Sequence, residues 1–256
     1  MRTVRLTLSQ VRYVNKAFWR NPARAFFTFA FPLMFLVIFT SLLGSGTVHL
    51  GRLSVKESTY YVAAMAAFGV ITSCFNNVAM TMTFQRDAGI LKRTNGTPLP
   101  AGSFLASRVV HALLIAVLLV AVTAAFGRAA YSANIPTGVT LAHFLVVLVI
   151  GAAAFCALAL ALTAFIPNAD AAAAIVNFAI LPLLFLSGIF IAFGNNTPSW
   201  VLWVARIFPV RHFALGMQAA FLGTPFHWSD VAVVAAWGAG GLLVAIRYFS
   251  WEPRTD

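Results

Sequence analysis

Long apolar tracts alternate with short charged segments along this chain of 256 residues. A helix needs roughly 20 apolar residues to cross a hydrocarbon core about 30 Å thick, where a charged group costs several kcal/mol. Six long tracts filled with Phe, Leu, Val, Ile and Ala contain no Lys, Arg, Asp or Glu: 25–51, 58–85, 109–127, 129–169, 171–205 and 231–246. They predict an all-α, polytopic membrane protein with six transmembrane helices, at about 25–43, 60–84, 104–126, 141–166, 171–193 and 231–249.

The segments outside these spans have patterns of their own. Basic positions before residue 25 fall on one helical face, with an aromatic anchor beside them, which predicts an amphipathic helix in the headgroup plane. Its interfacial residues are Arg12, Lys16, Trp19 and Arg20. Residues 194–230 predict two short helices at the outer surface. We therefore expect a cytoplasmic N-terminal (elbow) helix over 1–24, a six-span domain over 25–249 and a cytoplasmic tail over 250–256.

Composition supports a membrane domain, since 61% of the residues are hydrophobic and 9% are charged, against about 25% charged in soluble domains. The 17 basic and 6 acidic residues give a net charge of +11. With both termini in the cytoplasm, 12 of the 17 basic residues are cytoplasmic, and the other five are Arg52, Lys56, Arg128, Arg206 and Arg211. The positive-inside rule favours this orientation, and the basic excess then meets anionic lipid headgroups rather than nucleic acid.

The sequence shows no energy source of its own. None of the three lysines follows a glycine, so the chain has no P-loop, whose lysine and backbone amides hold phosphates. Asp170 is the only acid adjoining two spans. A helix N-cap or first-turn charge explains it, and the alternative is the ion site of a secondary carrier. A membrane-embedded enzyme would need an acid–base cluster at one depth, for which the sequence offers no candidate.

Two segments carry more information. Residues 85–98 are short, mixed in charge and placed directly after a span, so they are either a solvated loop or a docking helix that passes motion into two spans. Residues 181–190 place Pro182 and Gly188 inside an apolar helix. Loss of a backbone bond and of a side chain lets such a helix bend, and a bend can gate a path.

At these segments the chain resembles the membrane subunits of type 2 ABC exporters, including the daunorubicin-resistance-type permeases. In that family a Glu-Arg-Glu-x-Gly-Thr loop follows the second span and leads to Thr-Pro. Here the loop begins Gln85-Arg86-Asp87-Ala88-Gly89-Ile90 and ends Thr97-Pro98. The stretch 181–190 is similar to the family's apolar-Pro-apolar-Ser-Gly signature, and Pro198, Trp200, Trp203 and Pro209 are similar to its outer helices. Gln85, Asp87 and Ile90 depart from the pattern, which leaves the ion pairs to a partner unassigned.

The resemblance implies a permease subunit of an ATP-driven exporter in the bacterial cytoplasmic membrane. A separate ABC ATP-binding subunit would hydrolyse ATP with magnesium, and this chain would carry no cofactor, metal or catalytic residue. A second permease subunit, identical or different, would complete the pathway. The loop 85–98 would be the coupling helix, and its candidate contacts to the ATP-binding subunit are Arg86, Asp87, Gly89, Lys92, Arg93 and Pro98.

The resemblance also implies that the second and fifth spans line the substrate route. The candidate residues are Phe68, Phe75, Asn76, Asn77, Met80, Pro182, Phe185, Ser187, Gly188 and Phe190. An apolar lining with a few amides suits an amphipathic drug or lipid better than an ion, as in multidrug efflux. A polysaccharide or glycolipid exporter of the same family is the competing role, and an ion-coupled carrier is the alternative outside it.

Overall fold

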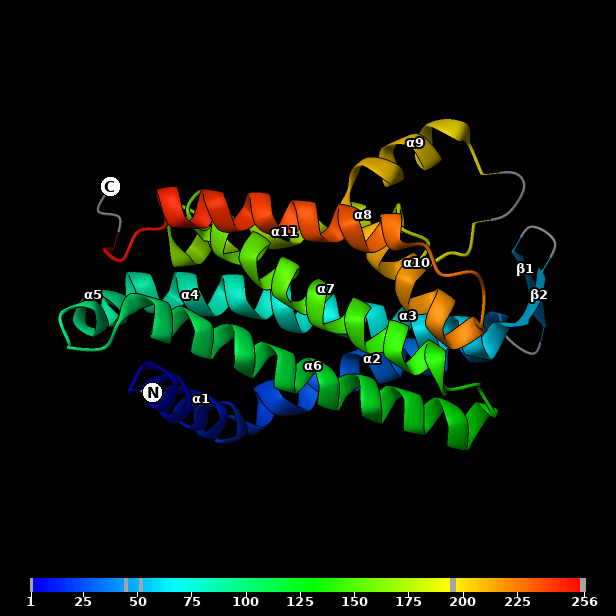
Figure 1. The fold of residues 1–256 in the computed structure, drawn as a ribbon, viewed down its shortest axis with the longest axis horizontal. Coiled ribbons are helices and arrows are strands. Elements are labelled where there is room, and N and C mark those ends of the chain that lie inside the picture. The colour runs from blue at the N-terminus through cyan, green and yellow to red at the C-terminus, as the bar shows by residue number, and fades with distance from the viewer. Residues whose placement is uncertain (1, 44–45, 51–52, 194–196, 254–256) are drawn as a thin grey trace.

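The computed structural model describes residues 2–43, 46–50, 53–193 and 197–253. Within them the chain forms an elongated bundle of helices with a small β-hairpin at one end (Figure 1). The elements are α1 (Arg2–Trp19), α2 (Pro22–Leu43), β1 (Thr47–Leu50), β2 (Leu53–Lys56), α3 (Glu57–Ile71), η1 (Thr72–Asn76), α4 (Asn77–Asp87), α5 (Ile90–Asn95), α6 (Ala101–Tyr131), α7 (Val139–Thr163), α8 (Ala169–Phe185), α9 (Ser199–Ile207), α10 (Pro209–Leu222) and α11 (Trp228–Tyr248).

Five helical stretches in the described part of the chain are long and apolar enough to cross a membrane: α2, the continuous α3–η1–α4, α6, α7 and α11. A sixth apolar helix, α8, has 17 residues and is therefore about 25 Å long. The predicted fold class, an all-α polytopic membrane protein, is confirmed. The helix α1 precedes the spans, and α9 and α10 lie between α8 and α11.

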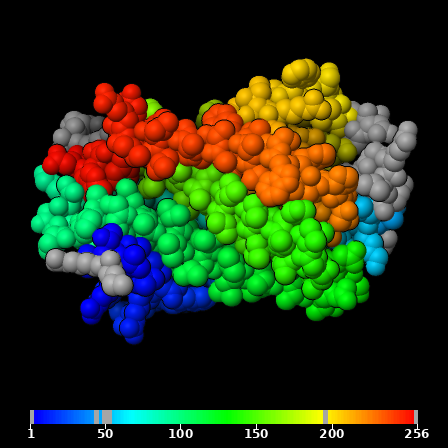
Figure 2. Space-filling model, viewed as in Figure 1, coloured from blue at the N-terminus to red at the C-terminus, as the bar shows by residue number. Residues whose placement is uncertain are grey.

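The helix α3 is the centre of the bundle. Its residues from Thr59 to Ile71 are all buried, and α2, α6, α7 and α10 pack around it. A helix that is apolar on every side is stable only when other helices cover it. In Figure 2, α6 and α7 lie between α1 at one edge of the visible face and α11 at the other.

Small residues bring α7 and α11 close together along their length. A Cβ added at Gly238 would lie 2.7 Å from the Cβ of Ala154, and one at Gly241 would lie 3.0 Å from the backbone nitrogen of Leu158. The first distance is shorter than real Cβ contacts and the second is tighter than most of them, so the two glycines permit this contact. Close backbone approach at small residues is a common way for membrane helices to associate.

The structure differs from the predicted elements in three places. The fifth span was expected to reach residue 193, but α8 ends at Phe185, and Gly188 adopts a φ of +84° in the turn that follows. The polar loop after the first span contains an antiparallel hairpin, in which Thr47 pairs with Lys56. The second span contains the π-helical turn η1, where one wider turn interrupts the regular hydrogen bonding.

The bundle has two distinct ends. The α5 end carries α5, the start of α1 and the residues that follow α11, and the hairpin end carries β1, β2 and α9 (Figure 1). Lys92 of α5 and Glu252 form an ion pair at 3.3 Å, which confirms that residues after α11 return to the α5 end. The helix α10 is largely buried among α3, α7 and α11, whereas most of α9 is exposed.

Candidate functional site

Arg86, at the end of α4, binds the end of α7 and the turn that follows it, at the α5 end. Its guanidinium donates to the carbonyl oxygens of Thr163 at 2.9 Å, Ile166 at 2.9 Å and Pro167 at 3.0 Å. Its Nε also donates to Asp87 at 3.1 Å. The side chain is only 2% exposed, so its charge is neutralised inside the chain. Carbonyls after the last turn of α7 need donors, and a cation there suits the helix dipole.

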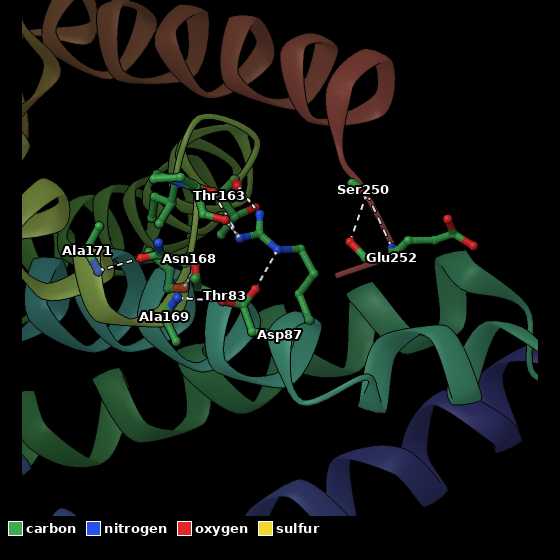
Figure 3. A network of polar contacts seen from close by, with 12 residues as sticks. Thr83, Asp87, Thr163, Asn168, Ala169, Ala171, Ser250 and Glu252 are labelled. Atoms are coloured by element: carbon green, nitrogen blue, oxygen red, sulfur yellow. Dashed lines mark hydrogen bonds and ion pairs between the residues drawn. The ribbon is translucent and has the colours of Figure 1, made fainter. Parts of the chain in front are cut away.

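Asp87, the last residue of α4, binds the start of α8. The backbone N–H of Ala169, the first residue of α8, donates to Asp87 Oδ2 at 2.5 Å (Figure 3). A carboxylate at a helix N-terminus is stabilised by the free N–H groups and the dipole. We define Arg86, Asp87 and the backbone carbonyls and N–H group that they bind as the arginine clamp. It fixes the α7–α8 turn to the end of α4.

The other predicted coupling residues lie on the surface around α5. Lys92, Arg93 and Pro98 are exposed, and Arg93 donates to the carbonyls of Gly89 at 3.3 Å and Ala88 at 3.1 Å. Gly89 has a φ of +68°, and a Cβ there would meet nothing within 4 Å. Glycine is therefore required by the backbone turn between α4 and α5 and not by a close neighbour within the chain.

The predicted interfacial residues lie on the exposed side of α1. Arg12, Lys16, Trp19 and Arg20 are exposed, whereas Phe18 is 1% exposed and α1 packs against α6. The indole of Trp19 stacks on Phe29 with 6.0 Å between ring centroids. The helix thus presents its basic residues outward while an aromatic residue fixes its other side to the bundle.

A hollow with a volume of about 440 Å³ lies between α2, α3, η1, α4 and α8. We call it the amide hollow, because three asparagines line it: Asn76, Asn77 and Asn177. Asn76 Nδ2 lies 3.4 Å from Asn177 Oδ1. Asn76 Oδ1 and Ser73 Oγ are buried and have no hydrogen-bond partner among the described residues. Buried polar atoms of this kind are costly unless another group binds them.

The π-helical turn sets the direction of these amides. The π-helical turn over Thr72–Asn76 is wider than a turn of a regular helix, and Thr72 Oγ1 at its start donates to the carbonyls of Phe68 and Gly69, each at 3.0 Å. One additional residue rotates every later side chain by roughly 100° about the helix axis. The wide turn therefore sets where Asn76 and Asn77 point relative to the residues of α3. Such turns are frequent at functional sites.

Arg24 closes the hollow towards the α5 end. Its guanidinium donates to Asn77 Oδ1 and, at 2.7 Å, to Thr81 Oγ1. The hollow thus combines amides, phenyl rings such as Phe31 and Phe68, and one cation. This set can hold a molecule that has both polar and apolar parts.

The structure brings together only some of the predicted pathway residues. Phe68, Asn76, Asn77 and Met80 line the amide hollow. Phe75 lies instead on an apolar groove of about 670 Å³ among α7, α8, α10 and α11, because its position in η1 directs its side chain away from the hollow. Pro182 is exposed on α8.

The remaining pathway residues lie where α8 ends. Phe185 and Phe190 form a ring pair at 4.9 Å, and Phe190 contacts Phe68 at 5.4 Å. Ser187 Oγ donates to the carbonyl of Leu184 at 2.7 Å. Tyr60 donates its hydroxyl to the carbonyl of Gly188. Ser187 and Gly188 therefore shape the turn after α8 and do not line the hollow.

Several residues of the hollow were missed by the sequence interpretation, among them the polar residues Arg24, Thr72 and Asn177. Asn177 is an amide inside an apolar tract, a signal that was available in the sequence. Arg24 was grouped with the headgroup-facing arginines of residues 1–24. Its partners Asn77 and Thr81 lie more than 50 positions away, and only the fold brings them to it.

These features define a polytopic membrane protein with a polar hollow inside its helices and a charged clamp at one end. The family model for the ABC-2 type transporter matches residues 6–222, and the chain belongs to this family. A search of curated proteins finds no match. The chain is therefore a transmembrane permease subunit of an ABC transporter and not its P-loop ATPase. Membership of this family implies an ATP-binding subunit and the lipid bilayer as its partners.

Proposed function

We propose that this permease subunit moves an amphipathic, drug-like or lipid-like substrate out of the cell, as in the daunorubicin-resistance-type branch of the family. The observation that carries the proposal is the amide hollow. Its volume of about 440 Å³ lies within the roughly 300–1,000 Å³ of small-molecule sites. Its asparagines offer hydrogen bonds to a polar group, and its phenyl rings offer apolar contact to the remainder of the molecule.

A second permease copy, identical or related, completes the pathway in this proposal. Aromatic side chains beside the hollow are exposed in the single chain: Phe27 is 61% exposed, Phe31 47% and Phe185 55%. They come from α2 and α8, on the same side as the hollow. A partner subunit that covers this face would enclose the route between the two copies.

The α5 end faces the cytoplasm of a bacterial cell in this proposal, together with both termini. The exposed cations Lys92 and Arg93 meet the ATP-binding subunit, which carries ATP and magnesium. The arginine clamp then transmits displacement of α4 and α5 to the α7–α8 turn, because its hydrogen bonds join these elements directly. Movement of α8 changes the wall of the amide hollow.

Replacing the amides tests this function. We expect Asn76→Leu and Asn177→Leu to raise, about two- to tenfold, the concentration of an amphipathic dye that gives half-maximal ATP-driven transport. One hydrogen bond contributes about 0.5–1.5 kcal/mol, which corresponds to this range. The assay uses inverted vesicles that contain the permease with its ATP-binding subunit. Asn134→Leu is the control, because Asn134 is exposed outside the hollow and, among the described residues, only its backbone N–H forms a hydrogen bond.

Three results would contradict the proposal. Unchanged dye transport in both asparagine variants would remove the hollow from the route. Uptake driven by a proton gradient without ATP would indicate a secondary carrier. Export of a glycolipid or polysaccharide, with no transport of the dye, would favour the carbohydrate-exporting branch of the family.

A further inference from the structure

A second cavity lies beside the amide hollow, on the other side of Arg24. It has a volume of about 70 Å³ and lies between α1, α2, α4 and α6. We call it the two-arginine pocket, because Arg24 and Arg108 both line it, together with His111. Its volume exceeds the ~10–15 Å³ that a single water molecule requires. The apolar part of its wall includes Val14, Ala17 and Phe18 of α1.

The positive charges of Arg24 and Arg108 are not balanced by any other described residue that lines the pocket. Its lining residues, all of them in the described part of the chain, include no Asp or Glu. Arg24 and Arg108 both line this small cavity, so their charges interact. In a partly desolvated site, two cations without a counter-charge destabilise each other. An anion bound between them would remove this repulsion.

Two polar atoms of the pocket residues are also without partners. Arg108 donates to Gln85 Oε1 at 3.0 Å and lies 4.7 Å from the ring centroid of Phe104. Its Nε, however, is buried and has no hydrogen-bond partner among the described residues. The same holds for Nε2 of His111, whose side chain is 5% exposed. A phosphate oxygen can accept hydrogen bonds from a guanidinium and from an imidazole N–H.

The position of the pocket indicates where the anion comes from. The amphipathic helix α1 forms one wall and exposes basic residues such as Arg12 and Lys16, as helices at a lipid headgroup layer do. A soluble phosphate would gain no binding energy from the apolar side chains of Val14 and Phe18. A phospholipid would place its phosphate on the arginines and its glycerol and acyl carbons against these apolar residues.

We infer that the two-arginine pocket binds the phosphate of an anionic phospholipid, held as a resident lipid and not as cargo. Arg24, Arg108 and His111 bind the phosphate group, and the residues of α1 cover the beginning of the acyl chains. Bound lipid would fasten α1 to α4 and α6, since the pocket lies between these helices. The inference does not depend on the proposed substrate. The amide hollow and this pocket share only Arg24 and Asn77, which lie in the wall between them and can serve both.

The test compares lipid binding to the purified full-length chain in a nonionic detergent. Dioleoyl phosphatidylglycerol, dioleoyl phosphatidylcholine and sodium phosphate are titrated separately. Native mass spectrometry counts the retained lipid, and the unfolding temperature reports its effect. We expect one phosphatidylglycerol per chain and a rise in unfolding temperature, because a ligand that binds only the folded state stabilises it. Phosphatidylcholine, with the same acyl chains and no net charge, should be retained more weakly.

Two variants and one control locate the binding site. Arg108→Gln removes a charge, and Ala17→Leu fills the pocket without changing charge while keeping a good helix former. Each should weaken phosphatidylglycerol binding at least about tenfold. Arg128→Gln makes the same charge change at the far end of α6, outside the pocket, and should bind lipid as the unmodified chain does. If Arg108→Gln does not fold, Ala17→Leu alone decides the matter.

Equal phosphatidylglycerol binding in Arg108→Gln and Ala17→Leu would overturn the inference. So would equal binding of phosphatidylcholine, because the charge of the pocket would then play no part. Full stabilisation by sodium phosphate, with no further effect of lipid, would assign the pocket to a soluble phosphate and overturn the lipid assignment. None of these results bears on dye transport, so failure here is distinguishable from failure of the proposed function.

Discussion

Buried and half-buried arginines near the α5 end occur in two settings that treat their charge in opposite ways. Arg86 binds three backbone carbonyls and Asp87, and it is almost wholly enclosed. Arg24 and Arg108 bind only neutral side chains among the described residues, namely Asn77, Thr81 and Gln85. The clamp contains its own counter-charge, whereas the two-arginine pocket has none. The first arrangement stabilises the fold alone, and the second is stabilised by a ligand.

The comparison separates structural arginines from binding arginines by the partners of each charged group. A buried charge with all its hydrogen bonds made is destabilising only when a partner is removed. A buried charge with a free N–H group is already destabilising and becomes favourable when an anion binds. Variants in the two settings should therefore differ in how much they change the free energy of unfolding and in how they respond to lipid.

The largest effect is expected for Arg86→Met. This change removes the donor from three carbonyls and leaves Asp87 without its cation. Breaking a buried pair in this way costs about 3–5 kcal/mol. We expect that loss in the free energy of unfolding, measured by titration with a denaturing detergent. Arg93→Met is the matched control, since Arg93 is exposed on α5. Equal stability of the two variants would show that the clamp does not hold the helices together.

Much of the fold follows from the apolar pattern alone. Charge-free tracts of sufficient length predicted the spanning helices, and the amphipathic pattern predicted α1. The features missed depend on contacts between distant parts of the chain or on a small change in helix geometry. The hairpin, the π-helical turn and the early end of α8 belong to this group. A tract such as 171–205 contains no charged residue to mark where its helix ends.

The candidate site was predictable only in part, and Arg86 explains why. The family resemblance assigned Arg86 to contact with a partner subunit, and a charged residue in a short segment after a span is usually exposed. The carbonyls that it binds lie 77 to 81 positions further along the chain. No local pattern indicates that the α7–α8 turn returns to α4. Asp170, by contrast, lies exposed in the first turn of α8, as expected for a first-turn charge, while the cap of α8 is the Asn168 side chain, bound by the N–H of Ala171 at 3.0 Å.

A smaller effect is expected for Arg108→Gln in detergent without added lipid. The change removes a hydrogen bond from a charged donor, which lowers stability. It also removes the repulsion between Arg108 and Arg24, which raises stability. These contributions oppose each other, so we expect the free energy of unfolding to change by no more than about 1 kcal/mol. A loss as large as that of Arg86→Met would show that the pocket is structural, contrary to the comparison.

The smallest effect on stability is expected for Lys92→Glu. Lys92 and Glu252 form an ion pair at 3.3 Å in which the side chains are 63% and 69% exposed. Exposed pairs contribute about 0.2–1 kcal/mol, and many contribute nothing measurable. The unfolding free energy should therefore change by less than about 1 kcal/mol. The charge itself remains available to a partner, because both groups are open to water.

The same variant distinguishes a charge that serves the fold from one that serves an interface. If Lys92 contacts the ATP-binding subunit, Lys92→Glu should reduce co-purification of that subunit severalfold, since reversal of an interface charge places like charges together. The exchanged pair, Lys92→Glu with Glu252→Lys, restores the ion pair within the chain but leaves a carboxylate at position 92. A docking role predicts that the exchanged pair stays defective, because the partner meets the wrong charge on α5. Full recovery in the exchanged pair would show that Lys92 acts only by holding the residues after α11, and Lys92 would then have no part in coupling.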